Sequence, residues 1–203
     1  EAMGYSQEVF KVLLVQFVAL KRGGEKVPMS TRAGKFVTLA EVVSEVGVDA
    51  ARFFFLMRSA DSHLDFDLEL AKKETPENPV YYVQYAHARI CSVFRTAQER
   101  GVEMSGGSEI DLSPLKEEEE FALIKKTLAF ANVVEKSALT LEVHRIPFYL
   151  QDLAASFHGF YNRHRIVTDD KALTLARLLM LACLRGVIKN GLALMGVSAP
   201  SKM

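Results

Sequence analysis

The chain has 203 residues, 49% of them hydrophobic and 25% charged, with 25 basic residues balanced by 25 acidic ones. That composition is typical of a soluble globular protein, and it excludes a disordered chain or a bundle of membrane spans. Acidic residues dominate in 101–142 and basic residues in 143–203, so the last third could face a polyanion although the whole chain is neutral.

The first residues and the two cysteines bear on the origin of the chain. The opening EAMGYS reads like the middle of a longer chain, so we expect a fragment. Cys91 and Cys183 both lie in apolar helical patterns, without zinc-type spacing. We expect both to be buried free thiols of a cytoplasmic protein.

The first 70 residues mix strand and helix signals. The apolar run 10–20 is followed by KRGGEK, a turn with two glycines, and then by a second apolar segment, VPM. This order predicts a β-hairpin with a moderately buried first strand. A short helix would produce the same run. Thr38 and Glu41 form a capping-box pattern, which predicts a helix to about Val46 that Gly47 ends.

The next segments alternate helices and loops. A second helix follows Gly47, with Asp49 in its first turn, and a polar loop then leads to a short helix from about Asp67. Beyond it, four long helical patterns are predicted over 79–100, 114–141, 147–165 and 170–195. The last is apolar nearly all round, as expected for the centre of a bundle. The sequence therefore predicts a mainly α fold, an antiparallel helical bundle over 71–203 preceded by a short α+β segment over 1–70.

One face of the helix predicted from Pro79 carries an unusual stripe of aromatic residues. Within an arc of about 100°, opposite the expected core, lie Tyr81, Tyr82, Tyr85, Arg89, Ser92 and Thr96. Phenol rings stack on unpaired bases and guanidinium groups pair with phosphate, so this stripe suits a single-stranded RNA loop. Alternatively, the tyrosines pack against a neighbouring helix.

The segment FHGFYNRHRI repeats this chemistry. Phe157 and Phe160 are expected in the core, whereas Tyr161 and the basic residues after it are expected to face a partner: Arg163, His164 and Arg165. His158 is interpreted as a polar group at a helix contact, without a catalytic role. Two aromatic and basic patches in one bundle favour RNA over protein as the partner.

Two acidic motifs are assigned no function. Alternating Asp61, His63, Asp65 and Asp67 resemble a set of metal ligands, but no second ligand cluster supports them and Asp67 is placed to cap a helix. We therefore predict no metal site. The run 117–120 is interpreted as a solvated helix start.

Several stretches together resemble a known family over nearly the whole chain. They are MSTRAGKFVTL, GVDAARFFFLMRSADSHLDFDLELA with its DAAR, NPVYYVQYAHARI and GLALMGVSAPSKM. They resemble the C-terminal half of bacterial arginyl-tRNA synthetases, which are class I aminoacyl-tRNA synthetases. DAAR alone would also fit the cysteinyl relatives; the tyrosine-rich helix and the tail favour arginine.

The resemblance implies two parts. Residues 1–70 would be the end of the catalytic core, with connecting helices and a degenerate Lys-Met-Ser-Lys-Ser loop that closes on ATP and stabilises departing pyrophosphate. In that loop Met29 and Ser30 match, whereas Pro28 and Thr31 replace the two lysines. The charge would come from Arg32 and Lys35.

Residues 71–203 would be the helical anticodon-binding domain. The resemblance places Tyr85, Tyr161 and terminal Met203 around anticodon-loop bases. The chemistry of the two patches adds further candidate RNA contacts, namely Tyr81, Tyr82, Arg89 and Arg163.

The implied reaction of the full-length enzyme is ATP-dependent attachment of arginine to its tRNA, with ATP and Mg²⁺ as cofactors. The chain lacks a His-x-Gly-His signature, so we expect it to be inactive alone, to bind none of these cofactors, and to need the missing catalytic half for ATP and arginine. We also expect a monomer without membrane contact. Two alternatives stay open: a stand-alone helical RNA-binding module and a helical protein-interaction module.

Overall fold

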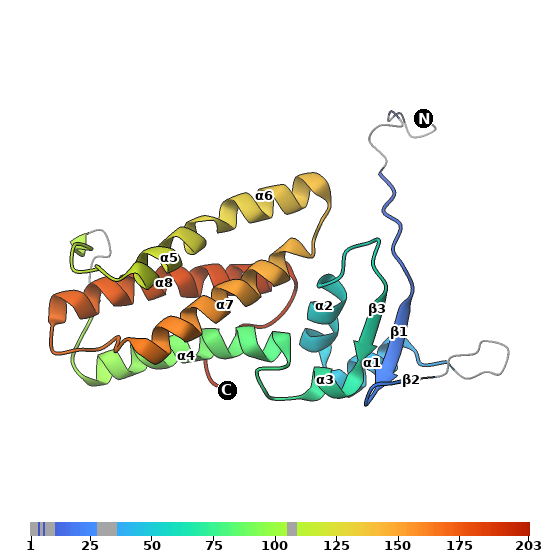
Figure 1. The fold of residues 1–203 in the computed structure, drawn as a ribbon, viewed down its shortest axis with the longest axis horizontal. Coiled ribbons are helices and arrows are strands. Elements are labelled where there is room, and N and C mark those ends of the chain that lie inside the picture. The colour runs from blue at the N-terminus through green and yellow to red at the C-terminus, as the bar shows by residue number, and fades with distance from the viewer. Residues whose placement is uncertain (1–3, 5, 7–10, 28–35, 105–108) are drawn as a thin grey trace.

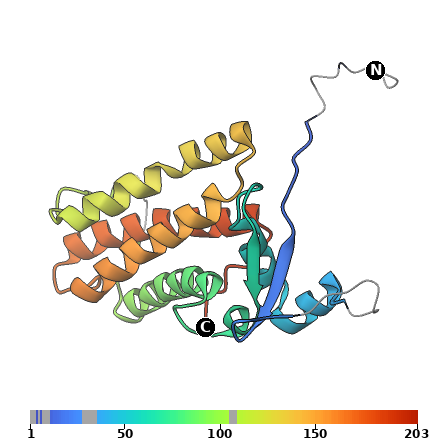
Figure 2. The ribbon, with the colours of Figure 1, turned by 45° about the vertical axis from the view of Figure 1, so that its right-hand side comes forward.

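The computed structural model describes residues 4, 6, 11–27, 36–104 and 109–203. A small α+β head lies at one end, and a bundle of longer helices forms the rest (Figure 1). The predicted fold class, mainly helical with a short α+β segment at the front, is confirmed. The C-terminus returns to lie beside α4 (Pro79–Glu99) in both views (Figures 1 and 2).

The head contains a three-stranded sheet in the order β2-β1-β3. Its strands are β1 (Val18–Arg22), β2 (Glu25–Lys26) and β3 (Leu64–Asp67). The predicted hairpin is present: β1 and β2 pair antiparallel around Gly23 and Gly24, whose φ angles of 60° and 88° suit a tight turn.

Two expectations for this sheet were wrong. The strand begins at Val18 instead of Phe10, and residues 11–17 extend away from the head with exposed side chains (Figure 2). The polar loop expected before Asp67 contains β3, which pairs in parallel with β1. That pairing joins segments more than 40 residues apart (Val18 with Leu64), so a local pattern does not reveal it.

The short helices of the head follow their capping signals. Thr38 caps α1 (Leu39–Val46), because its hydroxyl accepts from the Glu41 amide at 3.2 Å while the Glu41 carboxylate accepts from the Thr38 amide at 2.7 Å. Asp67 caps α3 (Leu68–Lys72) through its carboxylate alone, which accepts from the Glu69 and Leu70 amides at 2.9 and 3.3 Å. The remaining bounds are those of α2 (Val48–Leu56).

The bundle has five helices in the part of the chain that the structure describes. They are α4, α5 (Glu118–Leu128), α6 (Phe130–Thr140), α7 (Arg145–Arg163) and α8 (Lys171–Leu194). The single helix expected over 114–141 begins later, at Glu118, and is divided at Ala129. The Thr127 hydroxyl donates to the Leu123 carbonyl at 2.8 Å, a back-bond that bends helices.

The centre of the bundle is α8, as its apolar pattern predicted. Its inward side chains are fully buried and pack against α4, α5 and α7: Leu181, Leu184, Ile188 and Leu192. Phe157 and Phe160 of α7 lie in the same core, which confirms their expected positions.

The acidic helix start is not wholly solvated, contrary to prediction. Glu120 is fully buried, and its carboxylate pairs with the buried Arg177 of α8 at 2.7 Å. Local sequence shows an acidic first turn, but the cation that allows Glu120 to enter the core comes from 57 residues away.

The two cysteines and the possible metal ligands also have defined surroundings in the structure. Both cysteines are free, but Cys91 is half-buried and Cys183 exposed, so the expectation of two buried thiols was wrong. Asp65 pairs with Lys21 at 2.7 Å and Asp67 caps α3, so these carboxylates have structural partners. Among the described residues, no helix is long and apolar enough to cross a membrane.

Candidate nucleic-acid interface

An arginine lies between two tyrosine rings where α4 meets α7. The Arg89 guanidinium carbon is 4.6 Å from the Tyr85 ring centroid and 4.7 Å from that of Tyr161. Arg89 also donates to the Tyr85 hydroxyl at 2.7 Å. We call these three residues the tyrosine–arginine sandwich. Residues four apart share a helix face, so α4 supplies one ring and the cation while α7 supplies the second ring.

The predicted stripe on α4 divides into an outer and an inner part. Tyr81 stacks on Tyr85 with ring centroids 6.0 Å apart and planes 9° apart, which extends the sandwich. Tyr82 instead turns toward α7, with its ring 4.7 Å from His158. Burial raises the pKa of Tyr82. Tyr82 therefore packs against α7, as the alternative interpretation expected, and Tyr85 contacts α7 through His158 as well. All three tyrosines are half-buried.

His158 lies behind the sandwich as a buried polar group. Its Nε2 is 3.4 Å from the Tyr82 carbonyl oxygen, and its ring stacks on Tyr85 at 5.8 Å. Burial lowers the pKa of His158, and the nearby charge of Arg89 acts in the same direction. The side chain is thus held neutral, as a helix-contact group.

The basic residues after Tyr161 have different surroundings. Arg163 is exposed and pairs with Glu119 at 3.1 Å. His164 stacks on Phe160 at 4.8 Å and is only half-exposed, so it does not face outward as expected. Arg165 is exposed. This part of the interface therefore presents arginines, with the histidine packed behind them.

The C-terminal tail docks on α4 beside the stripe. Gln84 donates to the Ser198 carbonyl at 3.0 Å and to the Asp49 carboxylate at 2.8 Å. His87 Nδ1 lies 2.9 Å from the Pro200 carbonyl oxygen, and burial lowers its pKa. Arg95 donates to the Ser201 carbonyl at 3.1 Å. Met203 then ends the chain with its side chain 52% exposed.

The sequence analysis did not identify the residues that hold the tail. Gln84 and His87 lie on buried positions of α4, where apolar residues would be expected. Polar side chains at such positions need hydrogen-bond partners. That signal was present, but it does not reveal that the partners are tail carbonyls more than 110 residues away.

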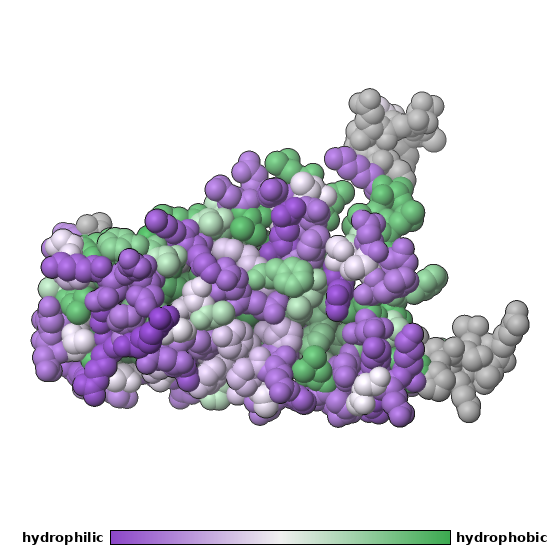
Figure 3. All heavy atoms as spheres, viewed as in Figure 1, coloured by the Kyte–Doolittle hydropathy of each residue, from purple (hydrophilic) through white to green (hydrophobic). Residues whose placement is uncertain are grey.

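The hydropathy of the surface changes along the bundle (Figure 3). Strongly hydrophilic side chains gather over one end of the bundle, while paler side chains cover α4 and α7 in the middle of the view (Figure 3). A face of this kind suits tyrosine-rich recognition, because phenol rings carry both an apolar body and a polar tip.

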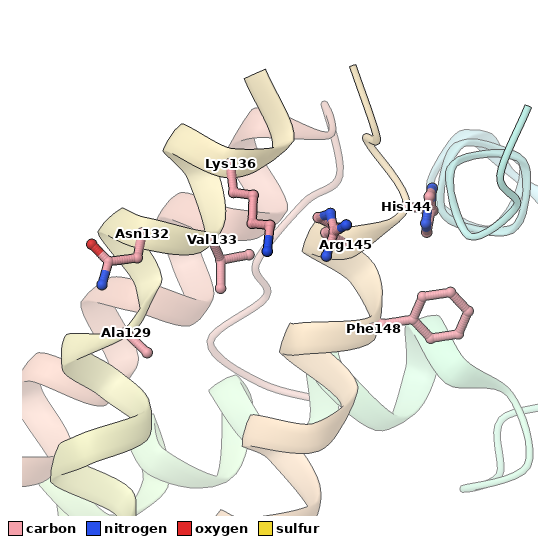
Figure 4. Close-up of a pocket in the computed structure, with 7 residues that line it drawn as sticks. All are labelled: Ala129, Asn132, Val133, Lys136, His144, Arg145 and Phe148. Carbon is pink, nitrogen blue, oxygen red and sulfur yellow. The ribbon is translucent and has the colours of Figure 1, made fainter. Parts of the chain in front are cut away.

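A hollow with basic side chains at its edge lies between α6 and α7, with a volume of about 590 Å³. Lys136 and Val133 on α6 and Arg145 on α7 face the space between the helices, and Phe148 projects from the other side of α7 (Figure 4). Arg145 is also paired with Glu142, its Nε donating at 2.6 Å. The sequence analysis did not single out this hollow.

Two groups of residues bear on cofactor and metal binding, the predicted ATP loop and one cluster of possible metal ligands. The predicted ATP-loop residues lie outside the described residues: Met29, Ser30, Thr31, Arg32 and Lys35. Glu117, Glu119 and His164 bring potential ligand atoms within 4.8 Å of one another. Glu119 is already paired with Arg163, so the cluster has a structural explanation.

Comparison with protein families gives one match over the bundle. A family model described as the DALR anticodon binding domain matches residues 83–203. The matched range includes the whole tyrosine–arginine sandwich and the docked tail.

Curated relatives extend the similarity to the head. An arginine–tRNA ligase from Syntrophotalea carbinolica is 55% identical over 196 residues, which are 97% of this chain and 35% of the relative. An arginine–tRNA ligase from Desulforamulus reducens is 51% identical over 203 residues, all of this chain and 36% of the relative. The chain thus spans about a third of the length of these relatives.

Solved structures show the same arrangement. A Campylobacter jejuni structure assigned to the arginyl-tRNA synthetases has a TM-score of 0.80 and 38% identity, covering 94% of this chain and 40% of the other. The Thermus thermophilus arginyl-tRNA synthetase has a TM-score of 0.67 and 29% identity, covering 85% of this chain and 29% of the other.

Proposed function

Because the chain belongs to the DALR anticodon-binding domain family, we propose that its bundle binds the anticodon stem-loop of arginine-accepting tRNA. The chain would be the C-terminal part of an arginine–tRNA ligase. Residues 71–203 would form the anticodon-binding domain, and residues 1–70 the end of the catalytic core with its connecting helices.

The tyrosine–arginine sandwich is the observation that carries this proposal. It offers aromatic faces for unpaired bases and a guanidinium for phosphate at one point of the surface. The rings are held by α4 and α7 instead of by loops, so the site is formed before RNA arrives. Preformed sites lose less entropy on binding.

Each candidate residue takes a part consistent with its position. Tyr81, Tyr85 and Tyr161 would stack on bases, and Arg89 would meet phosphate. Tyr82 would position the others through His158. Two further residues would contact the RNA from the edges of the site: Arg163, by exchanging Glu119 for phosphate, and Met203, from the docked tail.

The reaction of the longer protein would be ATP-dependent attachment of arginine to tRNA. ATP, Mg²⁺ and arginine would bind mainly in the part of the longer protein that this chain does not include, which is about two thirds of the length of the relatives. The degenerate loop would contribute from this chain through Met29, Ser30, Thr31, Arg32 and Lys35. We place the protein in the cytoplasm, as a monomer.

The test is a titration of the chain with arginine tRNA and with the same tRNA altered only at the middle anticodon base. Preference for the unaltered tRNA supports an anticodon reader. Equal binding to both, weakening steeply with salt, would reduce the proposal to a generic RNA-binding bundle. Absence of binding to both would contradict it.

A further inference from the structure

The DAAR stretch lies in the first turns of α2, where its end residues Asp49 and Arg52 contact the segment that follows α8. The C-terminal end of α8 lies on the side of the bundle toward the head (Figure 1). There a Cβ at Gly196 would lie 2.5 Å from Arg52 Nη1, so the guanidinium lies against the glycine backbone. The Gly196 φ of 65° favours glycine. The chain that leaves α8 therefore contacts the head as it turns toward α4.

Both oxygens of the Asp49 carboxylate bind Ser198. Oδ1 accepts from the Ser198 amide at 3.1 Å, and Oδ2 accepts from the Ser198 hydroxyl. Gln84 of α4 donates through Nε2 to Asp49 Oδ2 at 2.8 Å and to the Ser198 carbonyl at 3.0 Å. The amide, hydroxyl and carbonyl of Ser198 thus all have partners, which fixes its position and the direction of the chain. We call Asp49, Gln84 and Ser198 the tail clamp.

The rest of the tail depends on contacts of this kind for its position. Residues 197–203, all of which the structure describes, form no helix or strand. Beyond the tail clamp the chain lies along α4 (Figures 1 and 2), where His87 and Arg95 bond to the carbonyls of Pro200 and Ser201. Met203 follows, with an exposed side chain. A chain end is ordered only where it is bonded to the rest of the fold, so the direction set at the tail clamp bears on where Met203 lies.

A simpler role for Asp49 is to stabilise α2, because a carboxylate in the first turn of a helix interacts favourably with the helix dipole. That role requires only a negative charge near the N-terminus of the helix. It does not account for the binding of both carboxylate oxygens by Ser198, which lies 149 residues further along the chain.

We propose that Asp49 is a positioning residue for RNA binding, which holds Ser198 so that Met203 reaches the RNA interface. This inference rests on the proposed function, in which Met203 contacts RNA from the docked tail. It gives the DAAR stretch of the head a part in RNA binding that acts through the tail, without contact between Asp49 and RNA.

The test measures the affinity of a synthetic anticodon stem-loop from arginine tRNA for the 203-residue chain. Asp49→Asn leaves one acceptor oxygen for three hydrogen-bond donors, which are the Ser198 amide, the Ser198 hydroxyl and the Gln84 side chain. We expect the affinity to fall by about 2- to 10-fold, the range that corresponds to one lost hydrogen bond. Urea denaturation of each variant checks that the chain stays folded.

The charge change gives this test a clear sign. Removing a negative charge from a protein favours its association with RNA, so the charge change alone would make Asp49→Asn bind more tightly. Asp61→Asn, at an exposed position in the head, removes the same charge and is the matched control. It should leave the affinity unchanged or raise it slightly.

Ser198 tests the tail clamp from its other side, without any change of charge. Ser198→Ala removes the hydroxyl that donates to Asp49, whereas Ser198→Thr keeps a hydroxyl at this exposed position. We expect weaker RNA binding for the alanine variant and nearly unaltered binding for the threonine variant.

Deletion of Met203 distinguishes positioning from a structural role. If Asp49 acts through the tail, Asp49→Asn weakens binding in the unaltered chain and has no further effect in the chain that lacks Met203. A general effect of Asp49 on the bundle would weaken binding equally in both backgrounds, and that result would overturn the proposal.

The outcomes also separate this inference from the proposed function. If the unaltered chain binds the stem-loop while Asp49→Asn and Ser198→Ala behave like Asp61→Asn, the positioning role is refuted and the RNA-binding bundle remains. Retained affinity after deletion of Met203 has the same meaning. If the unaltered chain fails to bind the stem-loop, the proposed function falls, and the positioning role with it.

Discussion

The Glu120 carboxylate accepts a hydrogen bond from Arg177 Nε at 2.7 Å, and both side chains are buried inside the bundle. The other Glu120 oxygen accepts from the backbone amides of Lys116 and Glu117, at 2.8 and 3.0 Å, and so caps α5. Arg177 extends the network to the Arg165 carbonyl. One pair of residues therefore ties α5, α8 and the end of α7 together.

We predict that Glu120→Ala lowers the free energy of unfolding by about 3–5 kcal/mol, because it leaves the Arg177 charge buried without a partner. Urea denaturation followed by circular dichroism measures the change. Glu118→Ala, at an exposed neighbouring position, is the matched control and should have little effect. Equal stability of the two variants would show that the buried pair is not a determinant of folding.

Tyr161 should contribute to RNA binding through its ring. Tyr161→Ala is expected to weaken binding of the anticodon stem-loop by about 1–3 kcal/mol, the cost of one lost stacking contact. Tyr161→Phe keeps the ring over Arg89 and should bind nearly as well as the unaltered chain. Calorimetric titration of both variants gives the comparison, and unchanged affinity of the alanine variant would remove Tyr161 from the site.

Met203 tests the docked tail separately from the helices. Deleting this exposed residue leaves the bonds of Gln84, His87 and Arg95 to the tail intact. We therefore expect the unfolding transition to stay the same while affinity for the stem-loop falls. If affinity is retained, the tail serves the fold of the bundle and not the RNA.

Two glycines of α8 make a matched pair. A Cβ at Gly191 would lie 2.8 Å from Leu150 Cδ2, and Leu150 is fully buried. Gly191→Ala should therefore destabilise the chain by about 1–3 kcal/mol through overpacking. A Cβ at Gly186 would have no neighbouring heavy atom of the described residues within 4 Å beyond its own helix backbone. Gly186→Ala should stabilise the helix by up to about 1 kcal/mol, and thermal melts of both variants check the opposite signs.

His158 should make stability depend on pH. Burial lowers its pKa in the folded chain below the ordinary value of about 6.5. The folded state therefore binds the proton less well than the unfolded state. The stability that neutral His158 contributes is fully present above the ordinary pKa and is lost as the pH falls from that value through the lower pKa of the folded chain. His87 acts in the same direction. Carboxylates with lowered pKa values, such as Glu45 at about 2, act at lower pH.

We expect His158→Gln to reduce the loss of unfolding free energy between pH 7 and pH 5, measured by urea denaturation at each pH. His63→Gln, an exposed histidine before β3, is the control and should leave the loss as it is. An identical pH dependence in both variants would exclude His158 as a source.

Much of the fold was predictable because its signals are local. The caps at Thr38 and Asp67, and the apolar pattern of the last helix, each act over a few residues, and each was confirmed. The division of the 114–141 helix at Ala129 was missed, although Thr127 offers a local reason for it. The candidate contacts Tyr85, Arg89 and Tyr161 were also chosen from sequence, and the structure brings them together, while their binding of RNA remains a prediction.

By itself the sequence determined the types of the helices, the central place of α8 and the side-chain chemistry of the interface, because periodicity, capping and residue type act along the chain. Tertiary structure alone decided that β3 pairs with β1, that Glu120 is buried against Arg177, and that tail carbonyls satisfy Gln84 and His87. Each of these depends on a partner distant in sequence. The sequence shows that a buried polar group or a strand edge needs a hydrogen-bond partner, but only the packing of the whole chain decides which residue becomes that partner.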